Sequence, residues 1–241
     1  MEFTQENIQN KEEKELINYQ LDLNELKDEY HKINTVQINN ILEESFAEAL
    51  FKHAFLEKNW VLSTGFGKNK FQKANTKQFE KANALQIKNV NNHFKNDEFT
   101  YIFHRSMNNN KPNFLEFCIR KQLNSEKFIE MINNITNKNI TKLSTMFLSK
   151  YKSNNFLSPH SDRGNGKVAF VLNLSKFWKP QYGGILNFLD ESRKNIIKSY
   201  VPDFNNLILF EVPEEGYKPH FVSHVVPNIK HSRYAITGWY D

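Results

Sequence analysis

Cysteine is nearly absent from this sequence of 241 residues, which contains only Cys118. A single cysteine cannot form an intramolecular disulfide, so the chain does not resemble disulfide-stapled secreted domains and favours a reducing compartment. The stretch FLEFCIR around Cys118 is largely apolar, which favours a packing role for this thiol over a nucleophilic one. We therefore expect a cytoplasmic protein.

Long apolar segments are absent as well. No run approaches the roughly 18 apolar residues that a membrane span requires, and MEFTQENIQNKEEKEL at the start has no apolar core of a signal peptide. The net charge of +5 is mild and spread along the chain, without a basic stripe carrying interleaved aromatic residues. The sequence thus predicts no membrane segment, no signal peptide and no nucleic-acid partner.

Internal repeats and linkers rich in proline or glycine are missing too, which argues for one composite domain. Aromatic residues are abundant at 14%, so the chain can bury a substantial core. From about residue 140 onward, short β-rich runs alternate with turn formers such as RGNG and KPQYGG. About seven strands at this spacing predict an antiparallel sandwich or barrel, so the fold class is α+β and mainly β.

Helical patterns are mostly confined to the N-terminal half. Apolar residues at spacings of three and four predict a helical segment over residues 1–33 that packs on the domain. Beyond it, TVQI, NWVLSTGFG and EFTYIFHRSM are interpreted as strands, and a helix is expected from Ser125. We expect the main domain over residues 34–241, with its β core at about 140–241.

The stretch SPHSDRGNGKVAF places His160 and Asp162 two positions apart. Along an extended chain every second side chain points the same way, so these two groups converge while Ser161 faces elsewhere. Such a pair can bind a metal, form a buried ion pair or lie in solvent. A mononuclear iron oxygenase needs two histidines and one carboxylate on one face of the metal, so a distant strand would supply the third ligand.

Three histidines, His220, His224 and His231, follow in HFVSHVVPNIKHSRYAITGWY. We predict His224 as the third ligand, because its offset of nine residues from Arg233 suits two adjacent antiparallel strands that both face inward. His220 shares the strand parity of His224 and is the alternative. Arg233 is always charged and can grip a carboxylate with two parallel hydrogen bonds, although a surface or salt-bridged role is also open.

The ordered set HSD, WKPQYGGILNF, NNLILF, His224, Arg233 and GWY resembles the 2-oxoglutarate and Fe(II)-dependent oxygenases of the prolyl 4-hydroxylase type. The resemblance covers roughly residues 140–241. Within the family, the sequence is similar to the branch that contains ribosomal-protein prolyl hydroxylases and related bacterial proteins. The resemblance implies a double-stranded β-helix, or jelly roll, flanked by N-terminal helices. It also implies C–H hydroxylation coupled to decarboxylation of 2-oxoglutarate to succinate and CO₂, with O₂ consumed and ascorbate often keeping the iron reduced.

Individual roles follow from the same resemblance. Arg233 would bind the distal carboxylate of 2-oxoglutarate, and Tyr151 matches a tyrosine that reaches this cosubstrate. Asn173 stands where many relatives carry a second tyrosine, and Ala235 stands where they often carry a serine. The implied iron ligands are His160, Asp162 and His224.

Two other interpretations stay open. A cupin-like metal isomerase or hydrolase would share the barrel but would have no use for Arg233. A non-catalytic β-barrel binding module would share it too, although such a module would tend to lose a metal ligand. The substrate is also open among a prolyl residue in a protein, a free amino acid and a natural-product intermediate.

Overall fold

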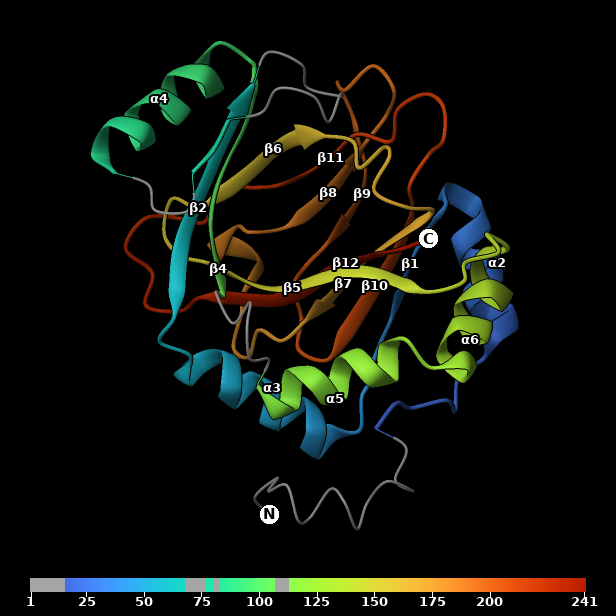
Figure 1. The fold of residues 1–241 in the computed structure, drawn as a ribbon. Coiled ribbons are helices and arrows are strands. Elements are labelled where there is room, and N and C mark those ends of the chain that lie inside the picture. The colour runs from blue at the N-terminus through green and yellow to red at the C-terminus, as the bar shows by residue number, and fades with distance from the viewer. Residues whose placement is uncertain (1–15, 68–76, 80–82, 107–112) are drawn as a thin grey trace.

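The computed structural model describes residues 16–67, 77–79, 83–106 and 113–241 (Figure 1). Helices are α2 (Leu23–Ile33), α3 (Glu44–Leu56), α4 (Ala84–Lys95), α5 (Phe114–Leu123) and α6 (Glu126–Thr136), with a 3₁₀ turn at Pro180–Tyr182. Strands are β1 (Thr35–Ile38), β2 (Trp60–Gly67), β3 (Lys77–Phe79), β4 (Phe99–Ser106), β5 (Leu143–Tyr151), β6 (Phe156–His160), β7 (Val168–Asn173), β8 (Leu186–Leu189), β9 (Ile196–Tyr200), β10 (Asn206–Glu211), β11 (His220–Val222) and β12 (Arg233–Tyr240).

The strands form one antiparallel sheet that folds into two facing walls. The order is β1-β10-β7-β12-β5-β4-β6-β11-β8-β9, and β2 with β3 extends from β4. Strand β4 pairs with β5, β6 and β2, so it joins the wall β1-β10-β7-β12-β5 to the wall β6-β11-β8-β9. Side chains from both walls pack together between them, among them Val171, Phe188 and Val222. This arrangement confirms the predicted jelly roll.

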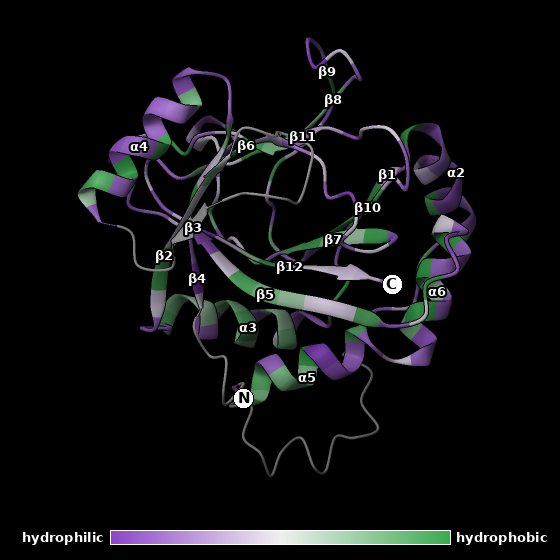
Figure 2. Ribbon diagram, turned by 45° about the horizontal axis from the view of Figure 1, so that its top comes forward, coloured by the Kyte–Doolittle hydropathy of each residue, from purple (hydrophilic) through white to green (hydrophobic). Residues whose placement is uncertain are grey.

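The central strand β7 shows why the sequence lacks simple alternation there. All six of its residues are buried, because both of its faces are covered. Ala169 and Val171 face the barrel interior, whereas Phe170 and Leu172 belong to a second core shared with the helices. Helices α3 and α5 lie along this outer face, and α2 packs beside α6 at its end (Figure 1). Most of α2 and α4 is hydrophilic, as expected of helices with one side in solvent (Figure 2).

The N-terminal helix is shorter than the sequence predicts. Helix α2 begins only at Leu23, because the side chain of Asp22 accepts hydrogen bonds from the backbone N–H groups of Asn24 and Glu25 and caps the first turn. Before the cap the chain is irregular, and Ile17 forms an isolated β-bridge with Leu42. The prediction of a helix over residues 1–33 is therefore wrong for residues 16–22, which are not helical. Residues 1–15 lie outside the described part of the chain.

Other local predictions are confirmed. TVQI forms β1, the two runs in the middle of the chain form β2 and β4, and Ser125 caps α6 by accepting from the N–H of Phe128. Within the described ranges, no helix combines the length and apolar character needed to cross a membrane.

Candidate metal centre

His160, Asp162 and His220 come together at one end of the barrel. His160 ends β6 and His220 begins β11, and the two residues are direct partners in the pairing of these antiparallel strands. Their imidazole centroids lie 4.3 Å apart. Nε2 of His160 is 3.4 Å from Oδ1 of Asp162, and Nε2 of His220 is 3.6 Å from Oδ2. One ligand atom from each residue lies within 4.8 Å of the others, so a single metal ion can be shared among them.

The other ring nitrogen of each histidine fixes its tautomer. Nδ1 of His160 lies 3.0 Å from the carbonyl oxygen of Ser158, and Nδ1 of His220 lies 3.1 Å from that of Lys218. A carbonyl oxygen can only accept, so Nδ1 carries the proton in both rings and Nε2 presents its lone pair. Metal-binding histidines are held in this way, so the residues fit a divalent metal.

Electrostatics favour the same ligand state. Burial by itself would raise the pKa of Asp162, but attraction to the protonated forms of His220 and His160 outweighs burial and holds that pKa well below its usual range, so the carboxylate stays ionised. Burial, followed by the neighbouring His160, lowers the pKa of His220. A carboxylate beside neutral imidazole is the protonation state in which these side chains bind metals.

Trp239 completes the surroundings of Asp162. Its indole Nε1 donates a hydrogen bond of 3.0 Å to Oδ2 of the carboxylate. The sequence predicts only aromatic bulk near the C-terminus at this position and no polar contact. The signal that could have found it is its even spacing from Arg233, which places both side chains on the same face of β12.

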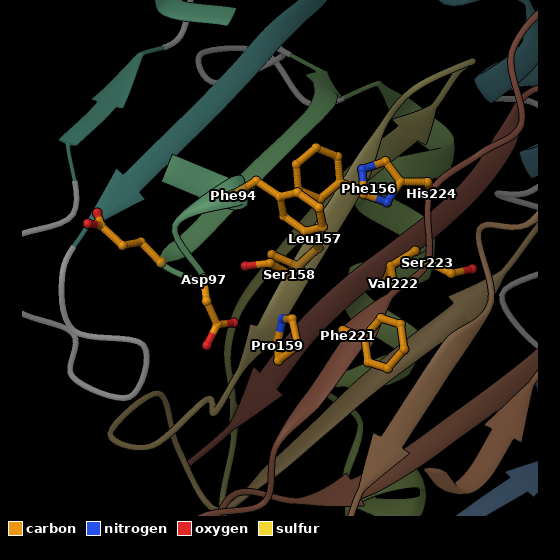
Figure 3. Close-up of a pocket in the computed structure, with 11 residues that line it drawn as sticks. Phe94, Asp97, Phe156, Leu157, Ser158, Pro159, Phe221, Val222, Ser223 and His224 are labelled. Atoms are coloured by element: carbon orange, nitrogen blue, oxygen red, sulfur yellow. The ribbon is translucent and has the colours of Figure 1, made fainter. Parts of the chain in front are cut away.

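His224, the predicted third ligand, lies outside this cluster. Its ring stacks on Phe156, with centroids 4.0 Å apart, and meets Phe94 at 5.0 Å. These rings line a pocket of about 310 Å³ against β6 and the end of β11 (Figure 3). His231 also lies apart and stacks on Tyr182.

The reason for this correction is an irregularity after β11. Val222 and Val225 both pack into the barrel core, although three positions rather than two separate them. The extra residue reverses the alternation, so His224 faces outward and is exposed. His220, the alternative with the same nominal parity, lies before this irregularity and joins the cluster.

Arg233 and Tyr151 form a second buried pair of the barrel. They are cross-strand partners on β12 and β5, and the guanidinium carbon lies 4.9 Å from the centroid of the phenol ring. Among the described residues, Nε of Arg233 has no hydrogen-bond partner. Burial outweighs the nearby guanidinium and raises the pKa of Tyr151 to about 12, so the phenol stays neutral. A buried cation beside a neutral phenol is suited to receive an anionic group.

Asn173 lies at the end of β7, directly opposite Ala235 on β12. It shares the inward face of Val171 and is fully buried. Neither its amide oxygen nor its amide nitrogen has a hydrogen-bond partner in the described part of the chain. Arg233 precedes Ala235 by two residues on the same face, so Asn173 and Arg233 are diagonal neighbours in the sheet. Unpaired polar atoms at such a place indicate a polar ligand.

Two histidines and one carboxylate inside a jelly roll are a donor set that suits a mononuclear iron site. Residues 146–241, which contain this cluster and Arg233, match the family described as the 2OG-Fe(II) oxygenase superfamily. The resemblance predicted from the sequence is therefore confirmed for the C-terminal barrel.

Named relatives are prolyl hydroxylases. The chain is 30% identical to prolyl 3-hydroxylase OGFOD1 of Mus musculus over 125 residues, which cover 50% of this chain and 22% of that protein. It superposes on a Pseudomonas putida prolyl-4-hydroxylase with a TM-score of 0.57 and 15% identity, covering 93% of both chains. It also superposes on a Trichoplax adhaerens prolyl hydroxylase in complex with a hypoxia inducible factor oxygen degradation domain peptide fragment. The TM-score is 0.59 and the sequence identity 16%, and the match covers 98% of this chain and 93% of that one.

The two solved structures show a shared fold. The chain spans between a fifth and a quarter of the length of the curated relatives it matches, with 22% and 23% covered.

Proposed function

We propose that this protein is an Fe(II)- and 2-oxoglutarate-dependent dioxygenase that hydroxylates a C–H bond and resembles the prolyl hydroxylases. The observation that carries the proposal is the cluster of His160, Asp162 and His220, in a barrel whose described residues leave Nε of Arg233 and the amide of Asn173 without hydrogen-bond partners. In the overall reaction 2-oxoglutarate is oxidised to succinate and CO₂. One oxygen atom of O₂ enters succinate and the other becomes the hydroxyl group of the product.

Each residue has a distinct task in this proposal. His160, Asp162 and His220 would hold the iron, and with only three protein ligands it could also bind the cosubstrate and O₂. The bound iron supplies the oxygen activation that protein side chains lack. Arg233 binds the distal carboxylate of 2-oxoglutarate with charge-assisted hydrogen bonds, and Asn173 donates an amide N–H beside it.

Tyr151 takes a supporting part. Its neutral ring packs against the guanidinium of Arg233 and leaves the positive charge available for the cosubstrate. Apolar neighbours such as Phe188 and Val222 exclude water from the reacting centre.

The two competing interpretations explain less of this site. A cupin-like enzyme that does not use 2-oxoglutarate has no task for a buried Arg233. A binding module has no need for two imidazoles whose Nε2 atoms are presented to the same carboxylate. An oxoacid that bridges the metal and Arg233 accounts for both features.

We further propose a prolyl residue in a peptide or protein as the substrate, on the strength of the relatives' names. A cavity of about 530 Å³ is lined in part by Arg105, Phe147 and Trp239, and Trp239 is the residue that donates to Asp162. Its aromatic walls suit the apolar ring of proline. The oxygenase domain would comprise residues 34–241, with ascorbate as an external reductant and the cytoplasm as the compartment.

The test begins with binding. Under anaerobic conditions, 2-oxoglutarate is titrated into protein saturated with Mn(II) as a redox-inert substitute for Fe(II), and into the metal-free protein as a control. We expect binding only with metal. Succinate release is then measured with Fe(II), ascorbate and either proline-containing peptides or free proline. Absence of metal-dependent 2-oxoglutarate binding would exclude the oxygenase, and turnover with free proline alone would exclude the peptide substrate.

A further inference from the structure

The two oxygens of the Asp162 carboxylate have different neighbours. Oδ1 faces Nε2 of His160 at 3.4 Å. Oδ2 accepts the hydrogen bond from the indole of Trp239 and lies 3.6 Å from Nε2 of His220. A carboxylate can bind a metal through one oxygen or through both. A donor fixed on Oδ2 occupies one of its lone pairs and favours binding through Oδ1.

The position of Trp239 is set by the sheet and not by Asp162. On β12, Trp239 pairs with Thr145 of β5 on one side and with Ala169 of β7 on the other. Its ring also packs against Phe147, with centroids 6.0 Å apart. The indole N–H is therefore held by a rigid element before any metal binds, as an orienting group must be.

We propose that Trp239 is a positioning residue that orients the Asp162 carboxylate so that Oδ1 binds the metal. This inference rests on the metal site of the proposed function. Trp239 also lines the cavity of about 530 Å³. A substrate group that fills this cavity therefore touches the residue that orients a metal ligand, so substrate binding and metal geometry are linked through one hydrogen bond.

The experiment uses the metal alone. Wild type, Trp239→Phe and Trp178→Phe are stripped with a chelator and titrated with Mn(II) by calorimetry, without 2-oxoglutarate. Trp178→Phe is the matched control, because it also removes an indole hydrogen bond, here 2.9 Å to the carbonyl oxygen of Gly183. We expect Trp239→Phe to weaken Mn(II) binding by about 10- to 100-fold, the usual effect of losing such an outer partner, and Trp178→Phe to leave it unchanged.

A spectroscopic readout separates orientation from general loosening. The visible absorption of bound Co(II) reports coordination number and geometry, so it should change in Trp239→Phe, where Asp162 is free to bind through both oxygens. It should not change in Trp178→Phe. Equal Mn(II) affinity and an identical Co(II) spectrum in Trp239→Phe and wild type would overturn the inference.

Two further outcomes are also decisive. If the wild type binds no Mn(II), the metal site itself is wrong and this inference falls with it.

If Trp239→Phe does not fold, the wild type is titrated with Zn(II) and its indole N–H signals are followed by NMR. The chain has three tryptophans, and Trp60→Phe and Trp178→Phe assign the signals by elimination. The Trp239 signal must shift on metal binding, and a signal that stays in place would refute the hydrogen-bonded link.

Discussion

The two ends of the candidate site differ in how well their polar atoms are satisfied. At the metal end, Nδ1 of His160 and of His220 donates to a backbone carbonyl, and Oδ2 of Asp162 accepts from Trp239. At the other end, the described residues offer no hydrogen-bond partner to Nε of Arg233 or to either amide atom of Asn173. The protein has already oriented the polar groups at the proposed metal end, whereas those at the other end are unsatisfied without a ligand.

The two ends therefore affect the free energy of the ligand-free protein differently. Fixing the histidines in advance reduces the ordering that metal binding must achieve. Unpaired buried groups cost about 1–3 kcal/mol each, so the Arg233 end weakens the ligand-free fold and regains stability when an oxoacid binds. The following predictions test the contrast, from the largest expected effect to the smallest.

The largest effect is expected at the third metal ligand. His220→Ala should weaken Mn(II) binding by more than about a hundredfold, because losing a direct ligand exceeds the loss of an outer partner. His224→Ala should bind Mn(II) as the wild type does, because its ring lies against Phe156 outside the cluster. Calorimetric titration of both variants decides the matter. Loss of binding in His224→Ala together with normal binding in His220→Ala would reverse the assignment.

The next effect concerns the cosubstrate anchor. Arg233→Ala should weaken 2-oxoglutarate by at least about tenfold, since a hydrogen bond to a charged group contributes roughly 1.5–3 kcal/mol. Mn(II) affinity should be unchanged, because the two ends are independent in this respect. Arg233→Lys should retain part of the affinity, since it keeps the charge but loses the planar fork. Titration of 2-oxoglutarate at saturating Mn(II) measures all three proteins, and equal affinities would make Arg233 structural.

A third prediction concerns the free energy of unfolding at alkaline pH. The folded protein raises the pKa of Tyr151 to about 12, chiefly through burial, whereas a free tyrosine titrates at about 10. The unfolded chain therefore loses this proton first, and the free energy of unfolding falls as the pH rises between these values. Wild type should lose up to about 1.4 kcal/mol per pH unit more than Tyr151→Phe. Urea unfolding at about pH 9, 10 and 11 measures this, and parallel pH curves would contradict it.

The smallest effect has opposite signs in two measurements. Asn173→Leu should stabilise the ligand-free protein by about 1 kcal/mol, because it removes two unpaired buried polar atoms. It should also weaken 2-oxoglutarate by about fivefold, because a neutral hydrogen bond is lost. Asn187→Leu is the matched control, since the Asn187 amide is bonded to Ile185 and Ser199 and its loss should destabilise. Destabilisation of the ligand-free protein by Asn173→Leu would mean that its amide already has a partner.

The sequence predicts the regular strands of this fold well. In β12, inward positions alternate from Arg233 as the strand pattern predicts. The structure adds the partners, with Tyr151 opposite Arg233 and Asn173 opposite Ala235. His160 and Asp162 converge as predicted, although β6 ends at His160 and Asp162 lies just beyond it. A strand period of two is sufficient wherever the sheet is regular.

The prediction failed where the alternation breaks. In the pairing of β6 with β11, His160 lies opposite His220 and Leu157 lies opposite Val222. Three residue positions on β6 therefore match two on β11, which marks a bulge beside the His/Asp/His cluster. A second irregularity follows β11 and turns His224 outward. Bulges depend on pairing with a distant strand, so no local pattern announces them, and a single extra residue exchanges the two faces. Asn173 shows a related limit, because its missing partners become visible only when its surroundings are assembled.

Strand β12 also fixes the distance between two residues of the candidate site. It carries Arg233 near one end and Trp239 near the other, and neighbours on both sides fix its register over most of its length. The proposed anchor for the distal carboxylate and the proposed positioning residue therefore lie at a fixed separation along β12. Homologues of 2-oxoglutarate with one more methylene group should be rejected by length alone. Admitting them would require shortening the side chain at position 233, since a slip of one residue along β12 would turn both groups out of the barrel.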